Sequence, residues 1–291
     1  MNHPEVPSDI LTGFYYDNAQ AVKQKLAQFA VLGSSGCHIV ADFDLTLTAG
    51  IAKGQNLGTW DVMDALMPPE GVERHRKIYE SFRPIELEGK LTETVAIEKW
   101  SETLDLICSY GINIDDVEEA FLSVSKLRSG ARQLFEICEM NSIPSVILSA
   151  GIKNVIQLMA DHYKINPTYI LATELEVDER RLITGWRQKT LIHMLNKKEM
   201  GHSELGPLRQ ARPHTILLGD VPDDARMVVG SDDVLRVRVL EPRKGESLDL
   251  QSALKSSYAA GFDLVVEHDL QPVAGVVGWL VGCSNIKSDS R

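Results

Sequence analysis

The chain has 291 residues, of which 44% are hydrophobic and 24% are charged, so it is long enough to bury a substantial core. Its net charge of -11 argues against a nucleic-acid polymer as partner, because such a partner requires a basic face. The four cysteines are scattered and form no CxxC pair, and residues 1–9 are polar, so we expect a cytoplasmic protein with reduced thiols and no signal peptide. The apolar segment 273–281 is too short to cross a membrane.

The first predicted elements are a helix and a buried strand. Apolar residues recur with a helical period over 18–32, and a strand over 37–42 runs into Asp42-Phe43-Asp44. On a continuing strand the two aspartates point to the same side, where they repel each other unless a cation or a proton is shared. The cation that we expect is Mg²⁺, which prefers carboxylate oxygens together with phosphate. Taken alone, Asp42 and Asp44 are explained more simply as a charged turn.

Residues 49–127 have a different pattern, with helical periodicity and no convincing strand. The best helices are predicted over 71–82, 92–110 and 115–124, and Asp115 can cap the last of them. The glycine-containing stretch 50–58 is typical of a connector. We interpret 49–127 as a helical cap domain inserted into a core domain that is formed by residues 1–48 and 128–291.

Alternation of strands and helices resumes at Ser129 and continues to the last strand. The sequence predicts a hairpin over 175–186, strands over 144–148, 168–172, 214–218, 234–239 and 264–266, and helices over 130–140, 152–162, 190–196 and 223–229. This alternation predicts an α/β fold with a Rossmann-like, doubly wound parallel sheet. Because ligands of such sheets bind outside the carboxyl ends of the strands, Asp42, Ser149 and Asp220 would lie along one edge.

Three further groups at this edge are candidates for chemistry, and each has a simpler interpretation. Ser149-Ala150-Gly151 opens a predicted helix, whose free N–H groups favour an anion, but Ser149 alone is more simply an N-cap. Lys197 could neutralise a phosphate, although a solvated surface lysine is the simpler interpretation. Asp220 and Asp224 could complete a Mg²⁺ site, or they could belong to a polar loop.

Taken together, these groups resemble the haloacid dehalogenase superfamily of phosphatases. The strings that carry this resemblance are Asp42-Phe43-Asp44-Leu45-Thr46, Ser149-Ala150-Gly151-Ile152, Lys197 and Gly219-Asp220…Asp224. Longer strings are similar to the cytosolic pyrimidine 5′-nucleotidase family. They are Asp42-Phe43-Asp44-Leu45-Thr46-Leu47, Ser142-Ile143-Pro144…Ser149-Ala150-Gly151-Ile152, Leu191-Ile192-His193…Asn196-Lys197 and Ile216-Leu217-Leu218-Gly219-Asp220…Asp224-Ala225-Arg226-Met227. The resemblance covers most of the chain and is closer in the core than in the cap.

The resemblance implies a role for each matching residue of the core. It implies that Asp42 is the nucleophile that forms an aspartyl-phosphate, and that Asp44 is the general acid and then the general base. Mg²⁺ would be bound by Asp42, by Asp220 and by the backbone carbonyl of Asp44. Asp224 would hold these ligands in position without binding the ion. Ser149, the N–H groups of Ala150 and Gly151, and the ammonium group of Lys197 would hold the phosphoryl oxygens.

The resemblance is weaker at two kinds of position. Where the family has a small polar residue and glycine after the metal-binding aspartate, this chain has Val221-Pro222-Asp223, so a hydroxyl ligand is not expected there. In the cap, Glu70 and Trp100 match family positions that contact the base. The simpler interpretations are an acid at a helix start for Glu70 and a core aromatic for Trp100.

The function that follows is a Mg²⁺-dependent 5′-nucleotidase that hydrolyses nucleoside 5′-monophosphates, with pyrimidine nucleotides as the expected substrates. One alternative is a phosphatase of a small phosphomonoester such as phosphoserine, since the core reads only the phosphate. The long helical cap favours the larger leaving group. A non-catalytic binding protein is disfavoured because every carboxylate, the serine and the lysine are present. Residues 50–58 and 126–130 are the hinges that we expect for the cap.

Overall fold

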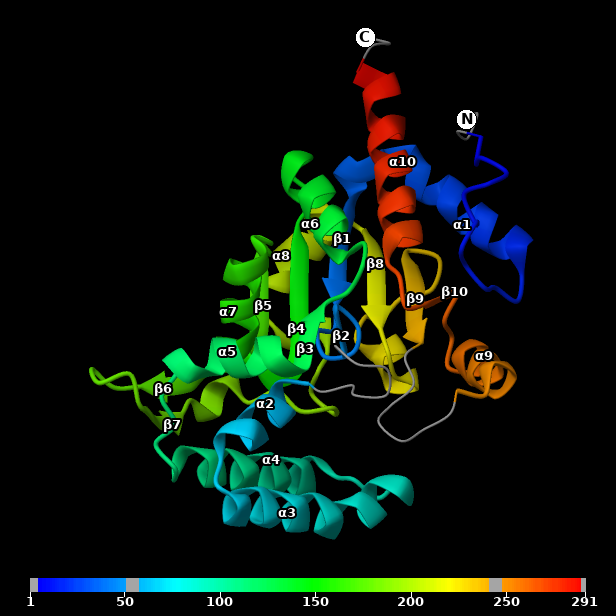
Figure 1. The fold of residues 1–291 in the computed structure, drawn as a ribbon. Coiled ribbons are helices and arrows are strands. Elements are labelled where there is room, and N and C mark those ends of the chain that lie inside the picture. Colours follow the sequence, from blue (N-terminus) through cyan, green and yellow to red (C-terminus); the bar gives the residue numbers. More distant parts are fainter. Residues whose placement is uncertain (1–4, 51–57, 241–247, 289–291) are drawn as a thin grey trace.

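The computed structural model describes residues 5–50, 58–240 and 248–288 (Figure 1). Its centre is a six-stranded sheet in the order β10-β9-β8-β1-β4-β5, in which every pair of neighbours is parallel. The strands are β1 (Cys37–Ala41), β4 (Ser145–Ile152), β5 (Tyr169–Thr173), β8 (His214–Gly219), β9 (Val234–Leu240) and β10 (Leu264–Glu267). The predicted α/β fold with a parallel sheet is confirmed.

The central strand is buried on both faces because both faces of the sheet are covered. All of β1 is buried, and its alternate residues belong to two different hydrophobic clusters. Ile39 and Ala41 belong to the larger cluster, to which α1 (Ala19–Leu32), α6 (Ala131–Met140), α7 (Lys153–Tyr163) and α10 (Gln271–Ser288) contribute. Val40 belongs to the smaller cluster, with Leu205 of α8 (Leu205–Ala211). This covering leaves the strand ends as the place where polar groups can gather.

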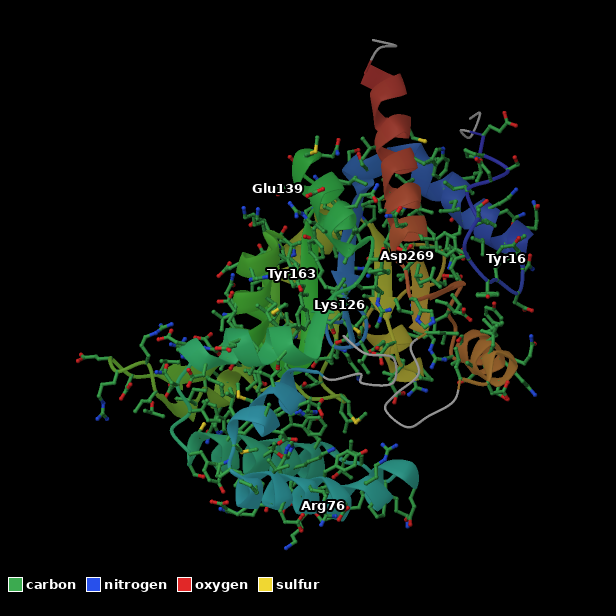
Figure 2. All side chains as sticks on the ribbon, viewed as in Figure 1. Tyr16, Arg76, Lys126, Glu139, Tyr163 and Asp269 are labelled. Carbon is green, nitrogen blue, oxygen red and sulfur yellow. The ribbon has the colours of Figure 1, made fainter. Side chains whose placement is uncertain are left out.

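The carboxyl ends of the strands point toward a set of helices between β2 (Thr48–Gly50) and β3 (Ser125–Leu127) (Figure 1). These helices are α2 (Thr59–Leu66), α3 (Pro69–Leu87), α4 (Glu93–Cys108) and α5 (Asp115–Val124). We call them, with the chain that joins them, the helical insertion. Figure 2 shows Lys126 at its return to the sheet, between Arg76 on α3 and Glu139 on α6.

The helical pattern of the insertion is confirmed, and two features of it differ from the prediction. β2 and β3 form a short antiparallel ladder at its base, where no strand is expected from the sequence. Asp115 is the first residue of α5 and not its N-cap, because Ile114 precedes it and the side chain of Asn113 accepts a hydrogen bond from the N–H of Asp115. Most of the predicted connector, residues 51–57, lies outside the described residues.

The hairpin and the helix after β8 are the next two predicted elements. The expected hairpin is confirmed as β6 (Leu175–Val177) and β7 (Ile183–Trp186), and the helix expected after β8 is the short 3₁₀ helix η4 (Pro222–Arg226). The remaining elements are α9 (Leu250–Ala259) and the 3₁₀ helices η1 (Gly33–Gly36), η2 (Gln188–Thr190) and η3 (Glu199–Gly201). Among the described residues, none of the helices combines the length and apolar character needed to cross a bilayer.

The helix predicted over residues 190–196 is wrong, and the side chain of Asn196 explains why. Only η2 touches that range, and the chain beyond it is a loop. Asn196 accepts a hydrogen bond from the N–H of His193 at 2.8 Å and donates one to the carbonyl of Leu191 at 3.0 Å. These side-chain bonds satisfy backbone groups that a helix would otherwise pair, which is how asparagine competes with helix formation. The loop ends at Lys197.

Candidate active site

A cavity of about 230 Å³ lies at the carboxyl ends of β1, β4 and β8. Every predicted site residue except Glu70 lines it: Asp42, Asp44, Trp100, Ser149, Ala150, Gly151, Lys197, Asp220 and Asp224. The other lining residues are Leu45, Trp60, Met194, Val221, Asp223 and Met227. The parallel topology is therefore responsible for bringing together side chains that are far apart in the sequence.

The two predicted residues of the insertion have different positions. Glu70 is exposed in the first turn of α3 and does not line the cavity. Trp100 of α4 lines the cavity, and its indole N–H donates a hydrogen bond to the carbonyl of Ala150 at 3.4 Å. The ammonium group of Lys99 lies 4.5 Å from the centre of the Trp100 ring. The structure thus joins α4 to the end of β4 through Trp100, and does not bring Glu70 to the site.

Lys197 is a buried ion-pair partner, so its interpretation as a solvated surface lysine is wrong. Its ammonium nitrogen lies 2.5 Å from Asp42 Oδ1 and 2.9 Å from Asp224 Oδ1, and the residue is 9% exposed. Burial lowers the pKa of Lys197, but the two carboxylates outweigh this and hold the pKa above its usual range. For Asp42 burial is the larger effect, and it raises the pKa even though Lys197 opposes it. One cation is thus shared by two carboxylates in a poorly solvated place.

Asp224 fixes the loop that carries Asp220. Its Oδ2 accepts hydrogen bonds from the backbone N–H groups of Asp220 at 3.0 Å and Val221 at 3.2 Å, while its Oδ1 meets Lys197. The chain comes so close here that a Cβ atom on Gly219 would lie 2.3 Å from the Cβ of Asp224, which only glycine avoids. Both oxygens of Asp224 are therefore occupied by donors from the protein.

The carboxylates of Asp42, Asp220 and Asp224 converge as a cation site requires. One oxygen of each lies within 4.8 Å of the others. The hydroxyl of Thr46 lies 3.3 Å from Asp42 Oδ2 and 3.5 Å from Asp220 Oδ1, so these two carboxylates face the same point. An all-oxygen donor set of this kind suits Mg²⁺, and a divalent cation would relieve the repulsion between the acids. The residues present fit a bound magnesium ion.

Asp44 is held by the first residue of α2 and has a strongly shifted pKa. The backbone N–H of Thr59 donates to Asp44 Oδ1 at 2.9 Å, and the Thr59 hydroxyl donates to Oδ2 at 2.8 Å. Burial, together with the negative charge of Asp42, raises the pKa of Asp44 to about 7. A carboxyl group with this pKa can give and accept a proton at neutral pH, which is what a general acid and base must do.

Ser149, Ala150 and Gly151 belong to the end of β4, so the expectation that they open a helix is wrong. The pairing of β4 with β5 shifts between Leu148 and Ile152, and this irregularity lets the strand continue to Ile152. The Ser149 hydroxyl accepts a hydrogen bond from the N–H of Gly151 at 3.0 Å. A Cβ on Gly151 would lie 2.3 Å from the Thr59 hydroxyl, so the close approach of α2 requires glycine.

The sequence reasoning missed two residues of the site, Thr59 and Trp60. Both belong to α2, which was not among the predicted helices, and Trp60 adds a second indole to the cavity. The signal was present, since Val62, Met63 and Leu66 have helical spacing directly after Gly58. The pattern covers only two turns, and it is short enough to be mistaken for part of a connector.

Comparisons with known proteins identify the family of the chain. Residues 45–280 match the family described as pyrimidine 5′-nucleotidase (UMPH-1). The 7-methylguanosine phosphate-specific 5′-nucleotidase A of Xenopus laevis is 23% identical over 275 residues, which cover 89% of this chain and 92% of that protein.

Two solved structures share the fold of this chain. The crystal structure of cytosolic 5′-nucleotidase IIIB bound to cytidine has a TM-score of 0.78 at 21% identity, covering 95% of this chain and 97% of that one. A substrate-bound phosphoserine phosphatase has a TM-score of 0.51 at 17% identity, covering 82% and 96%. At these identities both structures support the haloacid dehalogenase-like fold alone. The family match over most of the chain establishes the rest: this protein belongs to the pyrimidine 5′-nucleotidase (UMPH-1) family and is a phosphoric monoester hydrolase of the 5′-nucleotidase class.

Proposed function

We propose that the protein is a Mg²⁺-dependent hydrolase of nucleoside 5′-monophosphates that acts through an aspartyl-phosphate and prefers pyrimidine nucleotides. The observation that carries this proposal is the buried group formed by Asp42, Lys197 and Asp224, with the carboxylate of Asp220 converging on it. Phosphoryl transfer depends on positioning and on neutralising the phosphoryl oxygens, and this group supplies both functions.

In the proposed first step, a carboxylate oxygen of Asp42 attacks the phosphorus atom. The bond between phosphorus and the 5′-oxygen breaks as the bond to Asp42 forms, and Asp44 gives its proton to the leaving oxygen. In the second step, Asp44 takes a proton from water, the water oxygen attacks phosphorus, and Asp42 is released with inorganic phosphate. The pKa of Asp44, raised to about 7, supports this double role because both protonation states are accessible at neutral pH.

Asp42, Asp220 and the backbone carbonyl of Asp44 would hold the magnesium ion in this proposal. When bound, the ion would screen the carboxylate of Asp42 from the negative charge of the incoming phosphate. Asp224 would support the ligands without binding the ion, and this is supported by its two oxygens, which already accept bonds from Lys197 and from backbone N–H groups.

The proposed phosphate site consists of Lys197, the Ser149 hydroxyl and the N–H groups of Ala150 and Gly151. Their common position on the wall of the cavity that also contains Asp42 supports this assignment. Lys197 would lie between the nucleophile and the phosphoryl oxygens, where a fixed positive charge stabilises the transition state.

We further propose that residues 49–127 form a cap over a core made of residues 1–48 and 128–291. Trp60 and Trp100 come from this segment and line the cavity, and indole rings are suited to stack on a nucleobase. The Lys99 ammonium over the Trp100 ring favours a neutral base, such as a pyrimidine, over the cationic ring of 7-methylguanosine. Glu70 remains a prediction from resemblance, without support from its exposed position.

The test is a phosphate-release assay on a panel that contains CMP, UMP, 7-methylguanosine 5′-monophosphate and phosphoserine. We expect release from CMP and UMP that requires Mg²⁺, stops in EDTA and is lost in Asp42→Asn. Higher activity on 7-methylguanosine 5′-monophosphate would overturn the base preference alone. Higher activity on phosphoserine, the second candidate because of the related fold, would overturn the nucleotide assignment. No release from any member would refute the proposal.

We also infer that the protein acts in the cytosol. None of the four cysteines forms a disulfide bond within the part of the chain that the structure describes, and Cys37 and Cys138 are buried with pKa values that burial raises to about 12. Reduced and unreactive thiols fit a reducing compartment. Fractionation of cells followed by detection of the protein in the soluble cytosolic fraction tests this inference.

A further inference from the structure

Arg128 is buried at the point where the helical insertion returns to the sheet. It follows β3 directly, two residues after the Lys126 that Figure 2 marks, and it is 2% exposed. It is also one of the largest fully buried side chains among the described residues. A guanidinium group is always charged, so its burial requires partners that replace water.

The partners of Arg128 are the backbone carbonyls of the loop that follows Asp44. Its Nε donates to the carbonyl of Thr46 at 2.8 Å, and its Nη2 donates to the carbonyls of Leu45 at 2.6 Å and Thr48 at 2.8 Å. The backbone N–H of Arg128 donates to the carbonyl of Leu47 at 2.8 Å. One residue thus satisfies four consecutive carbonyls, those of residues 45–48, which we call the catalytic loop.

The catalytic loop has a conformation that needs such support. Leu45 has a φ angle of 63°, in the left-handed region that side chains other than glycine rarely adopt. The loop makes its own small contribution through the Thr48 hydroxyl, which accepts a hydrogen bond from the N–H of Leu45 at 3.0 Å. Without Arg128, buried carbonyls of this loop would lose their donors, and an alternative backbone conformation would become accessible.

The catalytic loop also touches the reacting groups. Leu45 lines the cavity, and the Thr46 hydroxyl lies 3.3 Å from Asp42 Oδ2 and 3.5 Å from Asp220 Oδ1. Because Arg128 holds the carbonyl of Thr46, it sets where that hydroxyl points. A shift of the loop would move Leu45, Thr46 and the backbone of Asp44 together.

We propose that Arg128 is a positioning residue for phosphate hydrolysis, acting through the catalytic loop without touching the substrate. This inference rests on the proposed function, since it takes Asp42 and Asp44 as the reacting groups. Arg128 also ties both connections of the insertion to the site, because Thr48 pairs with Leu127 next to it. Its planar fork is matched to several carbonyls at once, which the single ammonium of a lysine cannot reproduce.

The experiment compares Arg128→Lys and Arg128→Ala with the wild type and with Arg132→Ala as control. Arg132 is an exposed arginine on α6 that pairs with Glu136, so its loss should leave the rate within about twofold of wild type. For Arg128→Lys we expect kcat on CMP to fall about 100-fold with KM nearly unchanged, because small errors in position affect the transition state most. For Arg128→Ala we expect free guanidinium chloride at low millimolar concentration to restore kcat, and equimolar sodium chloride to have no effect.

The outcomes separate this inference from the proposed function. Wild type that releases no phosphate from any nucleotide refutes the proposed function. Active wild type with a folded Arg128→Lys variant of similar kcat overturns the inference about Arg128. The inference is also overturned if a folded Arg128→Ala variant is inactive and guanidinium does not restore it. If Arg128→Ala does not fold, as circular dichroism would reveal, the kcat of Arg128→Lys decides the matter.

Discussion

Replacing Asp44 by asparagine should make the metal-free protein more stable at alkaline pH, even though it removes the proposed general acid. Asparagine has nearly the same size and still offers an oxygen to the N–H of Thr59. It cannot ionise, however, so it avoids placing a negative charge beside Asp42 in a poorly solvated site. The substitution should abolish phosphate release while stabilising the fold.

The size and pH dependence follow from the pKa of Asp44, which rises from 3.8 in the unfolded chain to about 7 in the folded protein. Below pH 3.8 both states are protonated, and the carboxyl group does not affect the free energy of unfolding. As pH rises from 3.8 to about 7, Asp44 ionises in the unfolded chain before it ionises in the folded protein, so the free energy of unfolding falls over this range. The difference between these two pKa values corresponds to about 4 kcal/mol, and solvent in the open cavity that Asp44 lines should lower the effect to about 2 kcal/mol.

The assay is urea unfolding of wild type and Asp44→Asn in EDTA at pH 5 and pH 8. We expect the stability advantage of the variant to grow by about 1 kcal/mol or more between these values, with equal m-values. Asp223→Asn is the matched control, since Asp223 also lines the cavity but its side chain is 60% exposed. A stability difference that does not depend on pH, or a variant less stable than wild type at pH 8, would refute the reasoning.

Three other substitutions test the site from different sides. Lys197→Met leaves Asp42 and Asp224 buried without their shared cation, so we expect the free energy of unfolding measured in urea to fall by about 3–5 kcal/mol. A variant as stable as the wild type would contradict the ion-pair geometry. Thr59→Val keeps the volume but loses the hydroxyl that donates to Asp44, so kcat should fall about tenfold in a folded protein, and an unchanged kcat would mean that this bond does not assist catalysis. Trp100→Ala should raise KM for CMP by about tenfold or more and leave the hydrolysis of a small aryl phosphate unchanged, whereas equal effects on both substrates would exclude base stacking.

The sequence predicts the sheet well because buried parallel strands have a local signal. Ile39 to Ala41 and Ile216 to Leu218 are apolar runs that are soon followed by aspartates, and both belong to central strands with the site's polar groups at one edge. The order of the strands across the sheet could not be read in this way. It depends on which helices cover which face, and that is decided by long-range packing between clusters.

Within the site, the residues that follow the strands could be predicted and those that support them could not. Lys197 is the clearest case, since its neighbours Lys198 and Glu199 make it look like part of a solvated surface. Its burial depends on Asn196, whose side chain replaces helical hydrogen bonds and turns the loop toward Asp42. Thr59 contacts Asp44 only because α2 packs against the end of β4, a tertiary contact without a local signal.

The charges around the cavity bear on the order in which the proposed cation and the proposed substrate bind. Among the described residues that line it, five are aspartates and Lys197 is the one with a cationic side chain. Burial and this excess of negative charge together raise the pKa values of Asp42 and Asp44. A nucleotide brings further negative charge with its phosphate, so we expect it to bind more tightly once the charges of Asp42 and Asp220 have been neutralised. Binding of a divalent cation should therefore precede binding of the nucleotide, and we expect that cation where the side chains of Asp42, Asp220 and Thr46 converge.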